Sequence, residues 1–141
     1  MMDKLIKILN GGCHSLVVSN GETHIYDGRG VSDLYRLLNE EPEVLYGALV
    51  ADKIVGKGAA ALIAIGKPHA VYAEVISAPA YELLQRCGID TCYGKLVAYI
   101  ENRQGTGQCP LEMRCKDCLT PEECLLEISA FIEEMKKNNN K

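Results

Sequence analysis

Segments with the residue pattern of helices alternate with segments with the pattern of strands along almost the whole chain, and this alternation restricts the fold more than any other feature. Helices are predicted at residues 2–10, 32–41, 52–66, 77–87 and 121–135, and strands at residues 14–19, 23–26, 44–51, 70–76 and 96–100. Asn20-Gly21 lies between the first two strands and is typical of a tight hairpin turn. The order predicts an α/β fold, a three-layer α/β/α sandwich around a mixed sheet with an N-terminal hairpin.

Length and composition are those of one globular domain. The 141 residues contain no linker-like stretch and no internal repeat, so we expect a single domain over residues 1–141, with residues 136–141 as a frayed polar tail. The net charge of −4 argues against a nucleic-acid partner and against binding to an anionic membrane, because both need basic patches.

No segment of the sequence predicts a membrane span or an export signal. The longest apolar run, residues 59–65, is far shorter than the ~20 residues that cross a bilayer. The N-terminal segment has an amphipathic pattern without the apolar core of a signal peptide, so we expect a cytoplasmic protein. The sequence does not decide between a monomer and a homo-oligomer.

Two predicted helix starts carry residues that suit an anion. Lys53 and Lys57 lie at the glycine-flanked start of the third helix, although the spacing of the glycines does not match a phosphate-binding loop. Ser77 lies where a predicted strand ends and a helix begins, and open α/β sheets bind ligands at the carboxyl ends of their strands. A plain helix cap at Ser77 and an exposed lysine at position 57 are the alternative interpretations.

The densest polar loop of the chain, residues 101–110, follows the last predicted strand. Its amide, hydroxyl and guanidinium groups suit a small polar ligand, as do those of many functional loops. We expect Asn102 and Thr106 to close over a ligand bound at the helix starts.

Four of the seven cysteines are concentrated in sixteen residues near the C-terminus. Their CxxC core is typical of metal sites, whereas the outer spacings of five residues are not those of a common zinc ribbon. A structural metal and reversible oxidation of Cys115 with Cys118 are two interpretations, and separate buried thiols are the third. We expect that the four sulfurs do not all converge, because Cys124 lies on an apolar helix face and the other three lie in a polar loop: Cys109, Cys115 and Cys118.

The three histidines His14, His24 and His69 show no metal-binding spacing, and we interpret them as ordinary positions.

Three segments together resemble a known family: residues 47–60 (GALVADKIVGKGAA), 75–80 (VISAPA) and 102–112 (NRQGTGQCPLE). They are similar to domain-of-unknown-function family 1893 (DUF1893), uncharacterised proteins with a cytidine-deaminase-like fold. The resemblance runs from about Ser15 to Ile132. It implies a deaminase-like α/β/α sandwich, in agreement with the order of elements, and it brings no assigned activity.

The metal ligands of zinc deaminases are missing from the positions that the resemblance implies. Those enzymes use a His or Cys two residues before a Glu at one helix start, and Pro-Cys-x-x-Cys at the next. The first motif would fall at residues 59–61, which are all alanine, and the second at residues 79–83, where Ala80 and Leu83 replace both thiolates. We therefore predict no zinc-dependent deamination and no cofactor.

Without zinc, the two helix starts are predicted to present positive dipole ends to one pocket. The leading hypothesis is a protein that binds a nucleotide-like or other small anionic ligand through Asp52, Lys53, Lys57, Ser77, Asn102 and Thr106. The alternatives are a zinc-independent enzyme that uses Asp52, Lys57 or Cys109, and a metal or redox module built on the cysteine cluster. Lys57 is expected to be a surface residue, so that its replacement by Glu leaves the fold intact.

Overall fold

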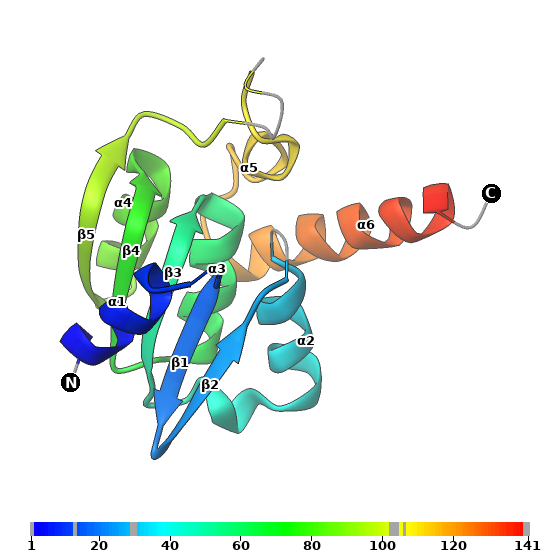
Figure 1. Cartoon of the computed structure of the whole chain (residues 1–141). Helices are drawn as coiled ribbons and strands as arrows, with labels where there is room; N and C mark the ends of the chain where they lie inside the picture. Colours follow the sequence, from blue (N-terminus) through cyan, green and yellow to red (C-terminus); the bar gives the residue numbers. More distant parts are fainter. Residues whose placement is uncertain (1, 13, 29–30, 102–104, 106, 140–141) are drawn as a thin grey trace.

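The computed structural model of the protein describes residues 2–12, 14–28, 31–101, 105 and 107–139, without the side chains of residues 138 and 139. A mixed, open sheet of five strands lies at its centre, in the order β2-β1-β3-β4-β5. The strands are β1 (Leu16–Asn20), β2 (Glu22–Tyr26), β3 (Leu49–Val55), β4 (Ala70–Ser77) and β5 (Asp90–Val97). The chain is therefore of the α/β class (Figure 1).

The sheet divides into an antiparallel part and a parallel part. β1 pairs antiparallel with both β2 and β3, whereas β3, β4 and β5 run parallel to one another. The predicted hairpin turn is confirmed at Gly21, whose φ of 82° lies in the left-handed region that favours glycine. Because β3 and β4 are adjacent and parallel, their carboxyl ends meet at one edge of the sheet, and the helices that follow them begin there.

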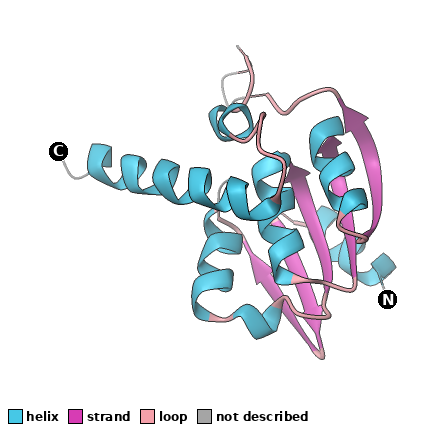
Figure 2. Ribbon diagram, turned by 180° about the vertical axis from the view of Figure 1, so that it is seen from behind, coloured by secondary structure: helices cyan, strands magenta, loops and turns pink. Residues whose placement is uncertain are grey.

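Helices lie on both faces of the sheet (Figures 1 and 2). They are α1 (Met2–Asn10), α2 (Ser32–Glu40), α3 (Lys57–Gly66), α4 (Ala78–Arg86), α5 (Pro110–Arg114) and α6 (Pro121–Asn139), with a short 3-10 turn at Pro42–Val44. On one face, Leu5 and Leu9 of α1 pack against Val17 and Ala51. The other face carries the larger core, to which α2, α3 and α4 contribute.

Helix α3 is the centre of the larger core. After Lys57 its residues are small or apolar all round, and all residues of the helix except Ile65 are buried. A helix without a polar face is typical of a position covered on every side. α6 provides part of this cover: Cys124 and Ile128 are fully buried in the core that contains α3, and the C-terminal end of α6 projects away from the other elements (Figure 2).

Several predicted boundaries differ from the structure. The strand predicted at residues 96–100 lies at residues 90–97. The prediction was displaced because β5 is an edge strand with mostly exposed residues, so its sequence shows no alternation of buried and exposed positions. β3 runs from Leu49 to Val55, so Asp52 lies inside a strand and does not cap a helix. The helix predicted at residues 52–66 begins at Lys57, because Gly56 and Gly58 weaken the first part of that segment as a helix.

Two further differences concern the C-terminal part of the chain. A short helix, α5, lies within residues 101–117, which were expected to be loop. α6 continues through Asn139, beyond residue 136, where the frayed tail was expected to begin. Thr120, Pro121 and Glu123 form a sequence typical of a helix start, and Thr120 caps α6: the backbone N–H of Glu123 donates to Thr120 Oγ1 at 3.2 Å. In the part of the chain that the structure describes, no helix is both long and apolar enough to cross a membrane.

We predict that the contact of α6 with the core stabilises the whole domain. Replacing Ile128 by Ala removes a fully buried side chain and is expected to lower the free energy of unfolding by about 2–5 kcal/mol. Leu126→Ala on the same helix is the matched control, since Leu126 is 75% exposed and its loss is expected to change stability by less than about 0.5 kcal/mol. Urea unfolding of both variants measures the difference, and equal effects would contradict this packing.

Candidate functional site

The starts of α3 and α4 lie side by side at the carboxyl edge of the parallel strands. Lys57 is the first residue of α3, and Ser77 is the N-cap residue of α4, where its Oγ accepts a hydrogen bond from the backbone N–H of Ala80 at 3.3 Å. Both residues are buried. Ser77 is therefore the helix cap that one interpretation of the sequence expected.

A carboxylate of the chain itself joins the two helix starts. Glu112 Oε2 accepts hydrogen bonds from the backbone N–H of Lys57 at 2.8 Å and from the Ser77 hydroxyl. Its second oxygen, Oε1, accepts the backbone N–H of Ile100 at 2.7 Å. Glu112 thus occupies the position at which the sequence predicted an external anion, and it satisfies N–H groups that a helix start leaves unpaired.

The local sequence brings Glu112 to this place. Cys109 and Pro110 start α5, and the Cys109 backbone N–H donates to the Ile100 carbonyl at 2.7 Å, which holds α5 beside the end of the sheet. Gly56 allows the close approach, because a Cβ at this position would lie 3.1 Å from Glu112 Oε2 and 3.3 Å from the Ile100 side chain.

The Lys57 side chain makes a second connection to the same segment. Its ammonium donates to the carbonyl oxygens of Lys116 at 2.9 Å and Cys118 at 2.6 Å. Only 5% of the Lys57 surface is exposed, so the expectation of a surface lysine is wrong. The substitution Lys57→Glu would place a carboxylate against two carbonyl oxygens and is therefore expected to disturb the fold.

A cavity of about 380 Å³ opens beside the Lys57 side chain. Its lining residues are Lys57, Pro79, Glu82, Arg86, Lys116, Asp117, Cys118 and Leu119. Three of them are cationic and two are acidic, and Arg86 and Lys116 are exposed. The cavity is of the size that small-molecule sites have, and its charge favours an anion.

The remaining predicted ligand residues do not line this cavity. Lys53 and Asp52 both lie in β3, where Lys53 is exposed and Asp52 is 8% exposed. Asn102 and Thr106 lie outside the described residues. Among the six predicted residues, the structure brings Lys57 and Ser77 together, through Glu112.

Burial changes the acidity of Asp52 strongly. Loss of contact with water raises the pKa of this carboxyl from 3.8 to about 7, and the negative charge of Asp33 adds to the shift. Hydrogen bonds from the backbone N–H groups of Ile54 and Lys53 oppose it. Asp52 is therefore a buried acid that changes its charge near neutral pH.

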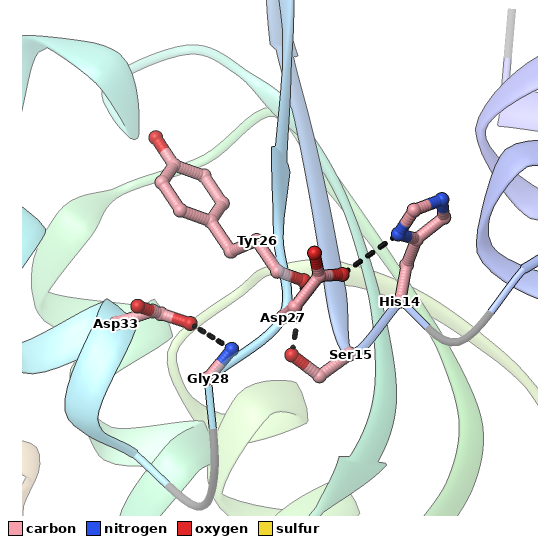
Figure 3. A network of polar contacts seen from close by, with 6 residues as sticks. All are labelled: His14, Ser15, Tyr26, Asp27, Gly28 and Asp33. Carbon is pink, nitrogen blue, oxygen red and sulfur yellow. Dashed lines mark hydrogen bonds and ion pairs between the residues drawn. The ribbon is translucent and has the colours of Figure 1, made fainter.

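A polar network connects β1, β2 and α2 at the end of the hairpin opposite the Gly21 turn (Figure 3). His14 Nδ1 lies 2.7 Å from Asp27 Oδ1, and the Ser15 hydroxyl donates to the Tyr26 carbonyl at 3.1 Å. The Gly28 backbone N–H donates to Asp33 Oδ2 at 2.9 Å. Asp33, which this network holds at Gly28, is the acid whose negative charge adds to the raised pKa of Asp52. No spacing in the sequence indicated the pairing of His14 with Asp27.

Three of the four C-terminal cysteines influence one another's acidity. The neighbouring Cys124 lowers the pKa of Cys115, and burial together with Cys124 raises the pKa of Cys118 to about 11. Cys115 was expected in a polar loop, but it is fully buried, because α5 turns its C-terminal end into the core. Cys109 is the N-cap residue of α5 and is half-buried. Within the described residues, no group of three or more His, Cys, Asp or Glu side chains is arranged to hold a metal ion.

The residues at the implied zinc positions do not fit that metal. Ala59, Ala60 and Ala61 belong to the buried core of α3, and Ala80 and Leu83 belong to the buried core of α4. None of these side chains carries a donor atom for zinc.

We predict that Asp52 makes the stability of the protein fall as pH rises. Between about pH 4 and pH 7 the folded protein keeps a proton on Asp52 that the unfolded chain releases. The free energy of unfolding therefore falls over this range, by about 4 kcal/mol at most, and the full decrease is present above pH 7. Asp52→Asn keeps an oxygen for the two backbone N–H groups and is expected to remove this dependence. Urea unfolding at about pH 5 and about pH 8 measures it. Asp90→Asn, at an exposed position, is the control, and an unchanged pH dependence in the Asp52 variant would contradict the prediction.

We also predict that Glu112 stabilises the two helix starts. A carboxylate accepts hydrogen bonds on both oxygens, whereas the amide of Glu112→Gln keeps one acceptor oxygen, so one of the backbone N–H groups of Lys57 and Ile100 loses its partner. The expected loss in free energy of unfolding is about 1–3 kcal/mol. Amide hydrogen exchange is expected to accelerate at whichever of Lys57 and Ile100 loses its partner, and to stay unchanged in the exposed control Glu122→Gln. Unchanged exchange at both residues in Glu112→Gln would contradict the bridging role.

Comparisons with known proteins agree with this fold. The chain matches, over residues 4–132, the family model described as a domain of unknown function, DUF1893 (TM1506). The crystal structure of a DUF1893 family protein (TM1506) from Thermotoga maritima is similar, with a TM-score of 0.85, 28% sequence identity and coverage of 92% of this chain and 88% of that chain. No curated protein matches the sequence. Since the family model covers most of the chain, this protein belongs to the DUF1893 family.

Proposed function

We propose that this protein binds a small anionic, nucleotide-like ligand in the cavity beside Lys57, on a deaminase-like three-layer α/β/α sandwich that has no zinc ligands and no proton shuttle. The observation that carries the proposal is the convergence of Lys57, Arg86 and Lys116 on one cavity of about 380 Å³. The strand order and the helices on both faces of the sheet support the sandwich assignment.

The fixed position of the Lys57 ammonium favours binding of an anionic ligand. Its ammonium is held by two carbonyl oxygens, so little side-chain freedom is lost when a ligand binds. Arg86, in the last turn of α4, has a planar guanidinium that suits phosphate or carboxylate groups. Lys116 adds a third positive charge from the segment that follows α5.

Because Glu112 lies between the starts of α3 and α4, we propose the anion site in the cavity beside Lys57 and not between the two helix starts, where the sequence predicted it. The N–H group of Lys57 and the Ser77 hydroxyl already donate to its carboxylate. An external anion at that point would have to displace a buried, hydrogen-bonded group. The cavity next to it offers cationic side chains without this displacement, so we place the acidic group of the ligand there.

Thermal-shift and urea measurements with inorganic phosphate and a panel of nucleoside monophosphates test the proposal. A ligand at a hundredfold excess over its dissociation constant stabilises a protein by about 2.7 kcal/mol. We predict stabilisation of the native chain and its loss in the double variant Arg86→Ala, Lys116→Ala. Both side chains are exposed, so the variant is expected to keep its fold without ligand.

Lys95→Ala is the matched control, because Lys95 is exposed on β5 and is not among the residues that line the cavity. It should leave the stabilisation unchanged. Absence of stabilisation by every probe, or equal stabilisation of the native chain and the double variant, would refute the proposed site.

A further inference from the structure

β5 is an edge strand with an unpaired outer side. It is the last strand in the order of the sheet, and its pairing with β4 runs without an offset from Asp90 to Val97, so no β-bulge interrupts it. No residue of β5 is a proline. Among the described residues, no segment pairs with this outer side, which therefore presents a row of free backbone N–H and C=O groups.

The side chains along β5 leave this edge open to another chain. Tyr93 is 41% exposed and Leu96 is 43% exposed, and Tyr99, two residues after the strand, is 42% exposed. Edge strands of soluble proteins are usually protected from pairing by charges, bulges or prolines. β5 has two charged residues, Asp90 and Lys95, and its centre is uncharged.

The opposite edge of the sheet is better protected. β2 has five residues, whereas β5 has eight. The Arg36 guanidinium of α2 lies over the Tyr26 ring of β2, 5.7 Å from the ring centroid, and Arg36 pairs with Asp33 at 3.5 Å. α2 therefore places two charged groups beside β2, and charges at an edge disfavour pairing with a second chain.

The flank of α4 beside β5 carries no charged residue. Tyr81 contacts Tyr93 edge to face, with the ring centroids 5.4 Å apart, so this flank is directed toward β5. Ala78 and Gln85 lie three residues before and four residues after Tyr81 on the same face of the helix, and both are exposed. A surface with tyrosine and without charge is typical of the centre of a protein interface. The charged residues of α4 lie toward the cavity described above, which they line: Glu82 and Arg86.

We propose that β5 pairs antiparallel with β5 of a second copy of this chain, so that the two sheets become one and the two α4 helices pack side by side. A two-fold axis between the β5 strands relates the copies, and each surface meets its own equivalent. The free backbone groups of both edge strands are then satisfied by the same ladder. The interface lies on the flank of α4 away from the cavity, so it does not depend on ligand binding.

The spacing of the layers fits this dimer. α4 packs against both β4 and β5, so its axis lies over the gap between these strands (Figure 1). Since paired strands lie about 4.8 Å apart, the gap between β4 and β5 is about 5 Å from the two-fold axis. The two α4 helices would lie about 10 Å apart, a distance at which helices pack against each other. The uncharged flanks of α4 would fill the space between them.

The distribution of charge favours the antiparallel orientation. Asp90 begins β5, and Lys95 lies in its second half. Antiparallel pairing brings the start of each strand beside the second half of its partner, so the acid approaches the base, whereas parallel pairing would place like charges together. The same two-fold places the positive N-terminal end of each α4 beside the negative C-terminal end of the other. The edge is therefore complementary to a second copy of itself.

Sedimentation equilibrium of the full chain tests the proposal. We predict a dimer, and we expect the double variant Tyr93→Lys, Leu96→Lys to be monomeric, with a dissociation constant raised about a hundredfold or more, because like charges then face each other across the interface. Ile25→Lys is the matched control, since Ile25 is 45% exposed on the other edge strand and its replacement should leave the dimer intact. A monomeric native chain, or equal loss of the dimer in the control, would overturn the proposal.

Gln85→Glu tests the same interface from α4, in case the double variant does not fold. Gln85 is exposed, so the variant is expected to keep its stability, which urea unfolding checks. The new carboxylates would lie beside the partner's α4 on both sides of the two-fold axis and weaken the dimer by about tenfold. A folded Gln85→Glu variant that dimerises as tightly as the native chain would refute the packing of the two α4 helices.

Amide hydrogen exchange identifies the strand that pairs. The outward N–H groups of β5 gain partners in the dimer, so exchange within residues 90–97 is expected to slow as the protein concentration rises through the range in which the dimer forms. Exchange in β2 is expected to stay constant. A dimer that protects β2, or that leaves β5 unprotected, would show association through a different surface and would refute the proposal.

Discussion

The carboxylate of Glu112 is the interaction on which the arrangement of the site depends. It accepts hydrogen bonds from the start of α3, from the cap residue of α4 and from the segment after β5. The parallel pairing of β3 and β4 brings the two helix starts to one edge of the sheet, and Glu112 joins them to the segment after β5. The N–H groups at a helix start need an acceptor, and a buried carboxylate needs donors, so each group satisfies the other.

Lys57 connects Glu112 to the segment that follows α5. Its backbone N–H donates to Glu112, and its ammonium donates to the carbonyls of Lys116 and Cys118. The same ammonium borders the cavity. The helix start, the segment after α5 and the candidate anion site are therefore connected through one lysine that is almost completely buried.

The close packing around α3 makes this organisation feasible. Gly58 lies so near Leu111 of α5 that a Cβ would approach its side chain to 3.0 Å, and Gly66 lies equally near Leu45. Small residues at these positions let α5 and the 3-10 turn approach the central helix. Because α5 also carries Glu112, the packing of Leu111 and the hydrogen bonds of Glu112 support the same position of α5.

The sequence by itself determined the features that depend on neighbours along the chain: the hairpin at Gly21, the caps at Ser77 and Thr120, and the α/β class. Turn geometry, capping and apolar periodicity act over a few residues and can be read directly. Only the tertiary structure decided what fills the space between the two helix starts, because Glu112 is 55 residues from Lys57 and 35 residues from Ser77 in the sequence. It also decided that Cys115 is buried in the core, and that Asp52 is buried in a strand. These pairings arise when the core brings distant segments together, and local sequence patterns carry no information on which polar groups will then face each other.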